Sequence, residues 1–328
     1  MVSYSKITVL RFFMKIVITD AGTVFDKFVS PDVFSKFGDV TKHHMLKYEE
    51  LAESIADADI VLCNKSVMDA DSLKYAKNLK YIGLFATGYN NIDTEYCRAH
   101  GITVCNAGSY STDAVAQHTF ALILSFFSRV GEYSSFVNNG GWMRSETFSP
   151  FICTHNELYG KTIGIVGYGS IGSKVAKIAN AFGMKVLAYT RTPKNDSDVE
   201  FVSFDKLLEM SDIVTVHCPL NEQSSKMFNK EAFAKMKNTA LFVNTARGGV
   251  VDELALRNAL DGKMIGGAAI DVLTVEPMGG DCVLDGAPDC VITPHVAWAP
   301  VETRQRLIGI VSGNIEAWLA GRPVNVIV

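Results

Sequence analysis

The sequence predicts an α/β fold made of two doubly wound domains, each built on a parallel sheet. Three observations lead to this fold class. Short apolar runs alternate with helix-length segments along the whole chain, which is typical of parallel sheets covered by helices. These runs fall into two consecutive series, one before and one after Gly160. The chain also has 328 residues, which is too long for one ordinary core and suits two domains.

The first series predicts four strands. Each run is short and apolar, as expected of strands buried on both faces, and the runs are residues 15–19, 60–64, 81–86 and 103–106. Residues 1–13 come before them and lack both a sustained apolar stretch and a small-residue cleavage site. We therefore expect residues 1–13 to form a loosely ordered extension.

An apolar helix is predicted between the two series. Residues 113–127 are apolar on nearly every face, and Thr112 or Asp113 is able to cap their helix. Such a helix must be buried on several sides, so we expect a hinge helix at residues 113–130 that packs between the domains and against a second subunit of a homodimer. An ordinary core helix of a monomer is the alternative. The polar, glycine-containing stretch at residues 138–150 predicts an exposed arm or loop.

The second series predicts six strands and a closing helix. The strands are expected at residues 162–166, 185–189, 213–217, 240–244, 268–271 and 291–293. A last helical pattern covers residues 302–319. Because this helix is long enough to cross back onto the first domain, we expect the second domain to be inserted in the first. Residues 1–108 and 299–328 then form a flavodoxin-like domain, and residues 109–298 form a Rossmann-type domain.

A glycine-rich turn opens the second series. The sequence GYGSIG at residues 167–172 follows an apolar strand directly and precedes a helical pattern at residues 173–182. In this context the three glycines favour a dinucleotide-binding turn over a purely structural one, because they allow a tight turn, a close approach of the pyrophosphate and close helix packing. Free N–H groups at the helix start favour the anionic phosphates. The expected contacts are Gly167, Gly169, Ser170, Ile171 and Gly172.

The end of the next strand bears on the choice between NAD and NADP. A carboxylate that binds the ribose hydroxyls is usual at this point, but Thr190 occupies the position. Arg191 and Lys194 follow and are able to bind a 2′-phosphate. The sequence therefore favours a site that accepts NADP. The alternative is a tolerant NAD pocket with an exposed Arg191 beside it.

Three residues suited to catalysis each follow a strand of the second series, namely Arg247, Glu276 and His295. Ligands bind outside the carboxyl ends of the strands in open α/β sheets, so all three should border one crevice. A guanidinium binds a carboxylate or polarises a carbonyl, and an imidazolium donates a proton while hydride reaches the carbon. A carboxylate beside the imidazole would orient it and keep it charged. Each residue alone has an ordinary structural explanation, but the ordered set predicts reduction of a carbonyl.

In these motifs, and across nearly all residues after Met14, the chain resembles the D-isomer-specific 2-hydroxyacid dehydrogenase family. The resemblance implies that Arg247, Glu276 and His295 form the catalytic set and that Asp271 contacts the nicotinamide carboxamide. Further cofactor contacts that we expect are Thr112 at the start of the hinge helix, His217, Cys218 and Pro219 in the loop against the adenosine half, and Thr245 and Ala246 before the arginine. Residues 109–298 would thus be the dinucleotide-binding domain.

The same resemblance implies a substrate site in the other domain and in the cleft between the domains. The loop at residues 85–93 is similar to the one whose backbone N–H groups hold the substrate carboxylate, with Thr87, Gly88 and Tyr89 at its centre. Lys65 belongs to a second loop that lines the pocket. The segment PHVAWA at residues 294–299 is most similar to glycerate dehydrogenases, also called hydroxypyruvate reductases, and Trp298 in it is expected to narrow the pocket. Reduction of hydroxypyruvate or glyoxylate to D-glycerate or glycolate follows as the expected reaction.

Composition argues against several other classes of protein. A formal net charge of −4 offers no basic surface for nucleic acid, and no apolar run is long enough to cross a membrane. The seven cysteines are scattered and never form a CxxC pair, which argues against a disulfide framework or a metal site and fits the reducing cytoplasm.

Two other functions stay open. A nucleotide-sensing regulatory protein that resembles the co-repressors of this family would keep the same Arg–Glu–His set, although this chain lacks their long disordered flanks. A dehydrogenase for a bulkier 2-oxo acid, such as a phosphorylated one, would need more basic residues near the cleft, and Lys65 is the obvious candidate. Glu276 argues against formate oxidation, because formate dehydrogenase-like relatives carry Gln there.

Overall fold

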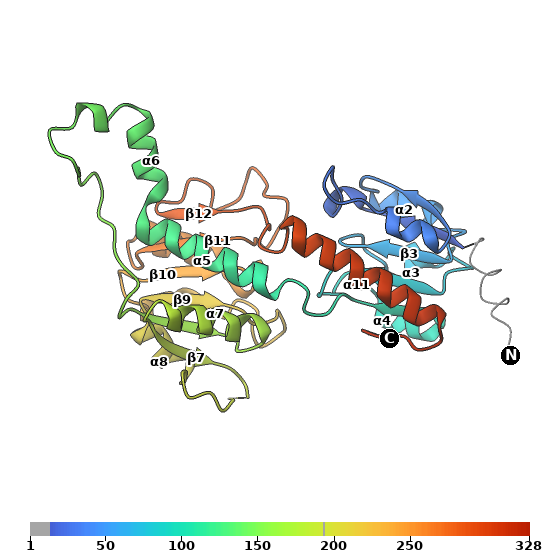
Figure 1. Ribbon diagram of the computed structural model, residues 1–328. Helices are drawn as coiled ribbons and strands as arrows, with labels where there is room; N and C mark the ends of the chain where they lie inside the picture. Colours follow the sequence, from blue (N-terminus) through green and yellow to red (C-terminus); the bar gives the residue numbers. More distant parts are fainter. Residues whose placement is uncertain (1–13, 193) are drawn as a thin grey trace, which may run out of the picture. The chain divides into compact units, whose positions relative to one another are not determined.

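The computed structural model describes residues 14–192 and 194–328 (Figure 1). The extension expected at residues 1–13 lies outside the described residues. The chain forms two compact units: unit 1 contains the described residues up to Ser111 together with Ala299–Val328, and unit 2 contains Thr112–Trp298. Each unit has one sheet in which all strands are parallel, so the predicted fold class is confirmed.

Unit 1 contains a five-stranded sheet of order β2-β1-β3-β4-β5, the flavodoxin-like order. Its strands are β1 (Lys15–Ile18), β2 (Asp39–Lys42), β3 (Ile60–Cys63), β4 (Tyr81–Leu84) and β5 (Thr103–Cys105). Its helices are η2 (Ala21–Thr23), η3 (Asp32–Lys36), α2 (Tyr48–Ser54), α3 (Ala70–Leu73), α4 (Thr94–Ala99) and α11 (Val301–Leu319). The prediction missed β2, because this edge strand is polar and mostly exposed.

The closing helix α11 was predicted correctly and belongs to unit 1. Its buried residues include Leu307, Val311 and Ile315, and its Trp318 ring lies 5.0 Å from the ring of Tyr81 in β4. These contacts bury the apolar face of α11 against the sheet of unit 1. Unit 2 (Thr112–Trp298) is therefore inserted between β5 and α11 of unit 1, as expected.

Unit 2 contains a seven-stranded sheet of order β12-β11-β10-β9-β6-β7-β8. Its strands are β6 (Thr162–Val166), β7 (Lys185–Tyr189), β8 (Glu200–Phe201), β9 (Ile213–Val216), β10 (Leu241–Asn244), β11 (Gly267–Ile270) and β12 (Cys290–Ile292). Its helices are α5 (Thr112–Ser128), α6 (Val130–Asn138), η4 (Trp142–Arg144), α7 (Ser170–Ala181), α8 (Phe204–Met210), α9 (Lys230–Lys235), η5 (Gly248–Val250) and α10 (Glu253–Asp261). The direction of the strand order reverses between β6 and β9, which is the point where ligands bind in Rossmann-type sheets. The two-residue strand β8 was not predicted, because it is too short to give a pattern.

The hinge helix differs from the prediction in two ways. It ends at Ser128, because Arg129 has a left-handed backbone with φ of 51°, and a separate helix, α6, follows. One helix over residues 113–130 is therefore wrong. Eight of the seventeen residues of α5 are buried, but every fourth position from Asp113 to Ser125 is exposed. As expected, α5 is buried on several sides within this chain, and only the stripe from Asp113 to Ser125 is exposed.

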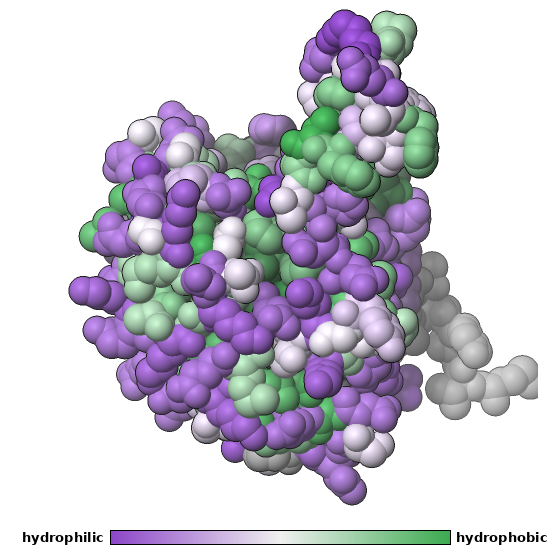
Figure 2. All heavy atoms as spheres, turned by 90° about the vertical axis from the view of Figure 1, so that its left-hand side faces the viewer, coloured by the Kyte–Doolittle hydropathy of each residue, from purple (hydrophilic) through white to green (hydrophobic). Residues whose placement is uncertain are grey.

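An arm formed by residues 130–152 extends from unit 2 and carries exposed apolar side chains. Figure 1 shows α6 continuing beyond α5 and away from the sheet. Met143, Phe148 and Phe151 are 88%, 91% and 84% exposed, and Figure 2 shows hydrophobic residues on the surface of the arm. The exposed arm predicted at residues 138–150 is therefore confirmed. Among the described residues, no helix is long and apolar enough to span a membrane.

Candidate active site

The glycine-rich turn connects β6 to α7, as predicted. Gly167 has φ of 99°, and a Cβ on it would lie 2.6 Å from the backbone nitrogen of Cys218, so only glycine fits this turn. A Cβ on Gly172 would collide with the carbonyl oxygen of Gly167, whereas a Cβ on Gly169 would meet open space. The helix begins at Ser170, three residues before the expected start, so Ser170 and Ile171 form its first turn. Open space at Gly169 beside a helix N-terminus fits a pyrophosphate.

A cavity of about 390 Å³ lies beside this turn. It brings together the glycine-rich turn, Thr190 and Arg191 at the end of β7, and the loop His217–Pro219 after β9. The lining residues, all of them in the described part of the chain, include no Asp or Glu. The cavity therefore has the position expected for the adenosine half of a dinucleotide, and its basic side chains are able to attract a phosphate.

The loop that carries Arg191 and Lys194 is tied to the glycine-rich turn. The hydroxyl of Tyr168 donates a hydrogen bond of 2.6 Å to Asp196, and this bond holds the pKa of Asp196 below its usual range. The ammonium of Lys194 lies 5.9 Å from the centre of the Tyr168 ring. Arg191 itself is exposed. The contact between Tyr168 and Asp196 was not predicted, because no local sequence pattern pairs a tyrosine with an aspartate 28 residues away.

His217 stands out in the wall of the cavity because its Nδ1 is buried and accepts or donates no hydrogen bond within the described part of the chain. Its Nε2 lies 2.9 Å from the hydroxyl of Thr215. Burial lowers the pKa of His217 to about 3, so the ring is neutral near pH 7. A neutral ring nitrogen that faces no protein partner is suited to a cofactor hydroxyl. Burial raises the pKa of the neighbouring Cys218 to about 11, which leaves it a protonated, apolar thiol.

Glu276 and His295 form a hydrogen-bonded pair in the loops that follow the neighbouring strands β11 and β12. His295 Nδ1 lies 2.7 Å from Glu276 Oε2, and the other carboxylate oxygen accepts a hydrogen bond from the backbone of Leu273. The backbone of His295 is left-handed, with φ of 53°, and its N–H donates to the carbonyl oxygen of Asp271. Since Nδ1 is bound to Glu276, the ring has its Nε2 available for a substrate.

Arg247 follows β10, the strand that pairs with β11 in the sheet. Its guanidinium is exposed and donates to the carbonyl oxygen of Ala246. Gly248 packs directly on the backbone of Leu273, where a Cβ would collide. This contact brings the loop of Arg247 against the loop of Glu276. Thr245, two residues before Arg247 at the same strand end, is buried, and its hydroxyl lies 3.1 Å from the hydroxyl of Thr119 in α5.

Asp271 is almost fully buried and has protein partners on both oxygens. Thr293 donates to it at 2.6 Å, and the backbone N–H groups of Val296 and Ala297 donate at 2.9 Å. His118 in α5 lies 3.4 Å away. Burial alone would raise the pKa of Asp271, but these hydrogen bonds hold it below its usual range. His118 was not predicted as a site residue, and its signal in the sequence is a single imidazole in an otherwise apolar helix.

The remaining predicted residues divide between the two units. Thr87, Gly88, Tyr89 and Lys65 belong to unit 1, where the Thr87 hydroxyl donates to the carbonyl oxygen of Gly108 and the Tyr89 side chain is exposed. In unit 2, Thr112 is the first residue of α5 and Trp298 is the last residue of the unit. Of the expected cofactor residues, the cavity brings together Gly167, Gly169, Thr190, Arg191, His217, Cys218 and Pro219. Ser170, Ile171, Gly172, Thr112, Thr245, Ala246 and Asp271 do not line it. The structure also pairs Glu276 with His295. Contact of these residues with substrate or cofactor stays a prediction.

Known proteins similar to this chain agree with the geometry. Residues 120–297 match the family model of the NAD binding domain of D-isomer specific 2-hydroxyacid dehydrogenases. A hydroxypyruvate reductase of Blautia hydrogenotrophica is 40% identical over 282 residues, which are 85% of this chain and 88% of that protein. A glycerate dehydrogenase of Methylorubrum extorquens is 40% identical over 281 residues, with the same 85% and 88% shares. A solved acyclic imino acid reductase (Bsp5) in complex with NADPH and D-Arg has 32% identity and a TM-score of 0.84, and the match covers 96% of this chain and 100% of that chain.

Proposed function

Because the chain belongs to the D-isomer-specific 2-hydroxyacid dehydrogenase family, we propose that it reduces hydroxypyruvate and glyoxylate to D-glycerate and glycolate. It is an oxidoreductase that uses a nicotinamide cofactor. The observation that carries the proposal is the 2.7 Å contact between Glu276 and His295 at the strand ends of the unit with the dinucleotide-binding turn. Two relatives bear the names hydroxypyruvate reductase and glycerate dehydrogenase, which supports the choice of substrates.

The reduction needs a hydride and a proton. When bound, the reduced nicotinamide supplies the hydride that adds to C2 of the 2-oxo acid. His295 donates the proton from Nε2 to the carbonyl oxygen as that oxygen becomes an alkoxide. Glu276 fixes the orientation of the ring through Nδ1. Arg247 and the backbone N–H groups of Thr87–Tyr89 bind the substrate carboxylate.

A substrate screen tests the proposal and its alternatives. Rates are measured with hydroxypyruvate, glyoxylate, pyruvate and phenylpyruvate, each with NADH and with NADPH. We expect hydroxypyruvate and glyoxylate to have the highest kcat/KM, and weak turnover of pyruvate, because one methylene changes specificity by only about 1–3 kcal/mol. A preference for phenylpyruvate would contradict the assignment to small substrates. Cofactor binding without turnover of any 2-oxo acid would favour a nucleotide-sensing protein.

The cofactor site accepts NADPH in this proposal. Thr190 replaces the carboxylate that would repel a 2′-phosphate, and the cationic side chains of Arg191 and Lys194 line the same cavity. A structural relative solved with NADPH supports this choice. The KM for NADPH is expected to be no higher than the KM for NADH.

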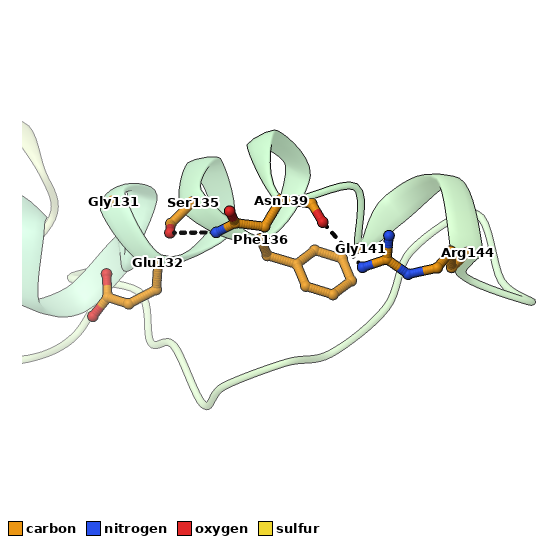
Figure 3. Close-up of a pocket in the computed structure, with 7 residues that line it drawn as sticks. All are labelled: Gly131, Glu132, Ser135, Phe136, Asn139, Gly141 and Arg144. Carbon is orange, nitrogen blue, oxygen red and sulfur yellow. Dashed lines mark hydrogen bonds between the residues drawn. The ribbon is translucent and has the colours of Figure 1, made fainter.

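The protein is a homodimer in this proposal, held by the arm and the exposed stripe of α5. The exposed side chains of Met143, Phe148 and Phe151 on the arm lower the solubility of the protein unless a partner covers them. A hollow of about 630 Å³ lies on the arm. In Figure 3 the Phe136 side chain points from α6 toward Gly141 and Arg144. Light scattering is expected to give a dimer mass for the wild type and a monomer mass for F148D/F151D. L254D, at an exposed leucine of α10, is the matched control, and a dimeric F148D/F151D would contradict the proposed interface.

The location that we propose is the cytoplasm. All seven cysteines are free thiols, and three of them are buried. Free thiols are typical of proteins from reducing compartments. Fractionation of cells that express the tagged protein tests this location, and recovery from an oxidising compartment would contradict it.

A further inference from the structure

A buried carboxylate near the end of β1 holds one of the loops that we expect to line the substrate site. Asp20 lies two residues after Ile18 and has no exposed surface. Its carboxylate accepts hydrogen bonds from three consecutive backbone N–H groups, at 2.9 Å from Asn64, 2.6 Å from Lys65 and 2.8 Å from Ser66. The hydroxyl of Ser66 donates a fourth bond at 3.1 Å. Asp20 thereby fixes the conformation of the loop that presents Lys65.

The same loop is tied to the loop of Thr87–Tyr89. The side-chain amide of Asn91 donates to the carbonyl oxygen of Ser66 at 2.7 Å, and the backbone N–H of Met68 donates to the carbonyl oxygen of Asn91 at 2.8 Å. The Thr87–Tyr89 loop is held by a further bond, in which the side-chain amide of Asn106 donates to the carbonyl oxygen of Thr87 at 2.7 Å. A continuous set of hydrogen bonds within unit 1 therefore joins Asp20 to the loop that is expected to bind the substrate carboxylate.

The two loops differ in which backbone donors they offer to an anion. The N–H groups of residues 64–66 all point at Asp20. In contrast, no hydrogen bond among the described residues uses the N–H groups of Thr87, Gly88 or Tyr89. Asp20 thus accepts hydrogen bonds from the backbone N–H groups of residues 64–66. The N–H groups of Thr87–Tyr89 are the ones that a ligand is able to use.

We propose that Asp20 is a positioning residue for the binding of the 2-oxo acid carboxylate. It acts through the 64–66 loop and Asn91 on the Thr87–Tyr89 loop, and it keeps the donors of residues 64–66 from competing for the substrate. This inference rests on the proposed function of the chain. Because the cofactor residues belong to unit 2, a change at Asp20 should affect the 2-oxo acid and not the cofactor.

The variant D20N tests the proposal with little change in shape. An amide NH₂ would then face the backbone N–H groups of Lys65 and Ser66, and the loop would have to move. We expect the KM for hydroxypyruvate to rise about tenfold or more, while the dissociation constant of NADPH, measured by fluorescence, changes less than about twofold. D59N is the matched control, because Asp59 accepts a hydrogen bond from the backbone of Lys15 at the opposite end of β1. It should keep the wild-type KM.

Two further measurements separate positioning from a general loss of structure. Binding of oxamate, a 2-oxo acid analogue that is not reduced, should weaken in D20N to the same extent as the KM rises, which gives a readout that does not depend on turnover. N91A and S66A should each raise the KM severalfold, and they replace D20N if that variant does not fold. In the double variant D20N/N91A the two effects should be less than multiplicative, because both act through Ser66.

Three results would overturn the proposal: a wild-type KM in D20N, equal weakening of oxamate and cofactor binding, or wild-type KM values in both N91A and S66A. Failure of the proposed function looks different. In that case the wild type itself reduces no 2-oxo acid, while the oxamate measurement still decides whether Asp20 shapes an anion site.

Discussion

Removal of the Arg191 guanidinium is expected to weaken NADPH binding and to leave NADH binding unchanged. Arg191 lines the cavity beside the glycine-rich turn. It follows Thr190, which occupies the position where a carboxylate is usual. A well-placed hydrogen bond to a charged group contributes about 1.5–3 kcal/mol, but an exposed ion pair contributes only about 0.2–1 kcal/mol. Arg191 is exposed, so the lower range applies. The KM for NADPH in R191A should therefore rise about 1.5- to 5-fold.

The assay is steady-state reduction of hydroxypyruvate with each cofactor, at low and at raised salt. Salt screens exposed charges, so it should raise the KM for NADPH in the wild type more than in R191A. K194A is expected to act in the same direction, and K206A is the matched control because Lys206 pairs with Glu200 on β8. The reasoning is refuted if the wild type uses NADH alone, or if R191A and K194A both keep the wild-type KM for NADPH.

Three further predictions concern catalysis and stability. H295A should lose roughly two to four orders of magnitude in kcat with unchanged cofactor affinity, and a variant that keeps a tenth of the wild-type kcat removes His295 from the mechanism. E276Q should lower kcat at least about tenfold, since Nδ1 of His295 loses its anionic partner at 2.7 Å; an unchanged kcat would show that the contact is not used. His217 should make the protein less stable in acid, because its pKa is about 3 when folded and 6.5 in the reference state, so the unfolded chain binds the proton first as the pH falls below 6.5. At pH 5 the free energy of unfolding, measured with urea, should be about 2 kcal/mol lower than near pH 7 because of His217. The variant H217N should not show this decrease.

The parallel sheets and the dinucleotide-binding turn were predictable because their signals are local. Buried parallel strands are continuous apolar runs, and ten of the twelve strands in the described part of the chain were expected near their observed positions. The two that were missed, β2 and β8, lie at sheet edges. An edge strand is held by hydrogen bonds to one neighbour and needs no apolar pattern, so the sequence contains little signal for it.

The parts of the site that escaped prediction depend on contacts between distant residues. His118 and Asp271 come from α5 and from the end of β11, and their contact exists only once the helix packs on the sheet. Asp20 likewise finds its donors in the loop after β3. A buried carboxylate cannot be told from an exposed one by its neighbours in the sequence, because the donors that stabilise it lie elsewhere in the chain. The break at Arg129 was missed for a different reason, since arginine rarely adopts a left-handed backbone.

We propose that this chain transfers hydride from a nicotinamide to C2 of a small 2-oxo acid, with His295 as the proton donor. Reduction of hydroxypyruvate with NADPH or NADH that carries deuterium in the transferable position tests this claim most directly, with chiral separation and mass spectrometry of the product. We expect D-glycerate with one deuterium at C2, formed by the wild type and, at a rate at least about a hundredfold lower, by H295A. Product without deuterium, L-glycerate, or no product with either cofactor would contradict it.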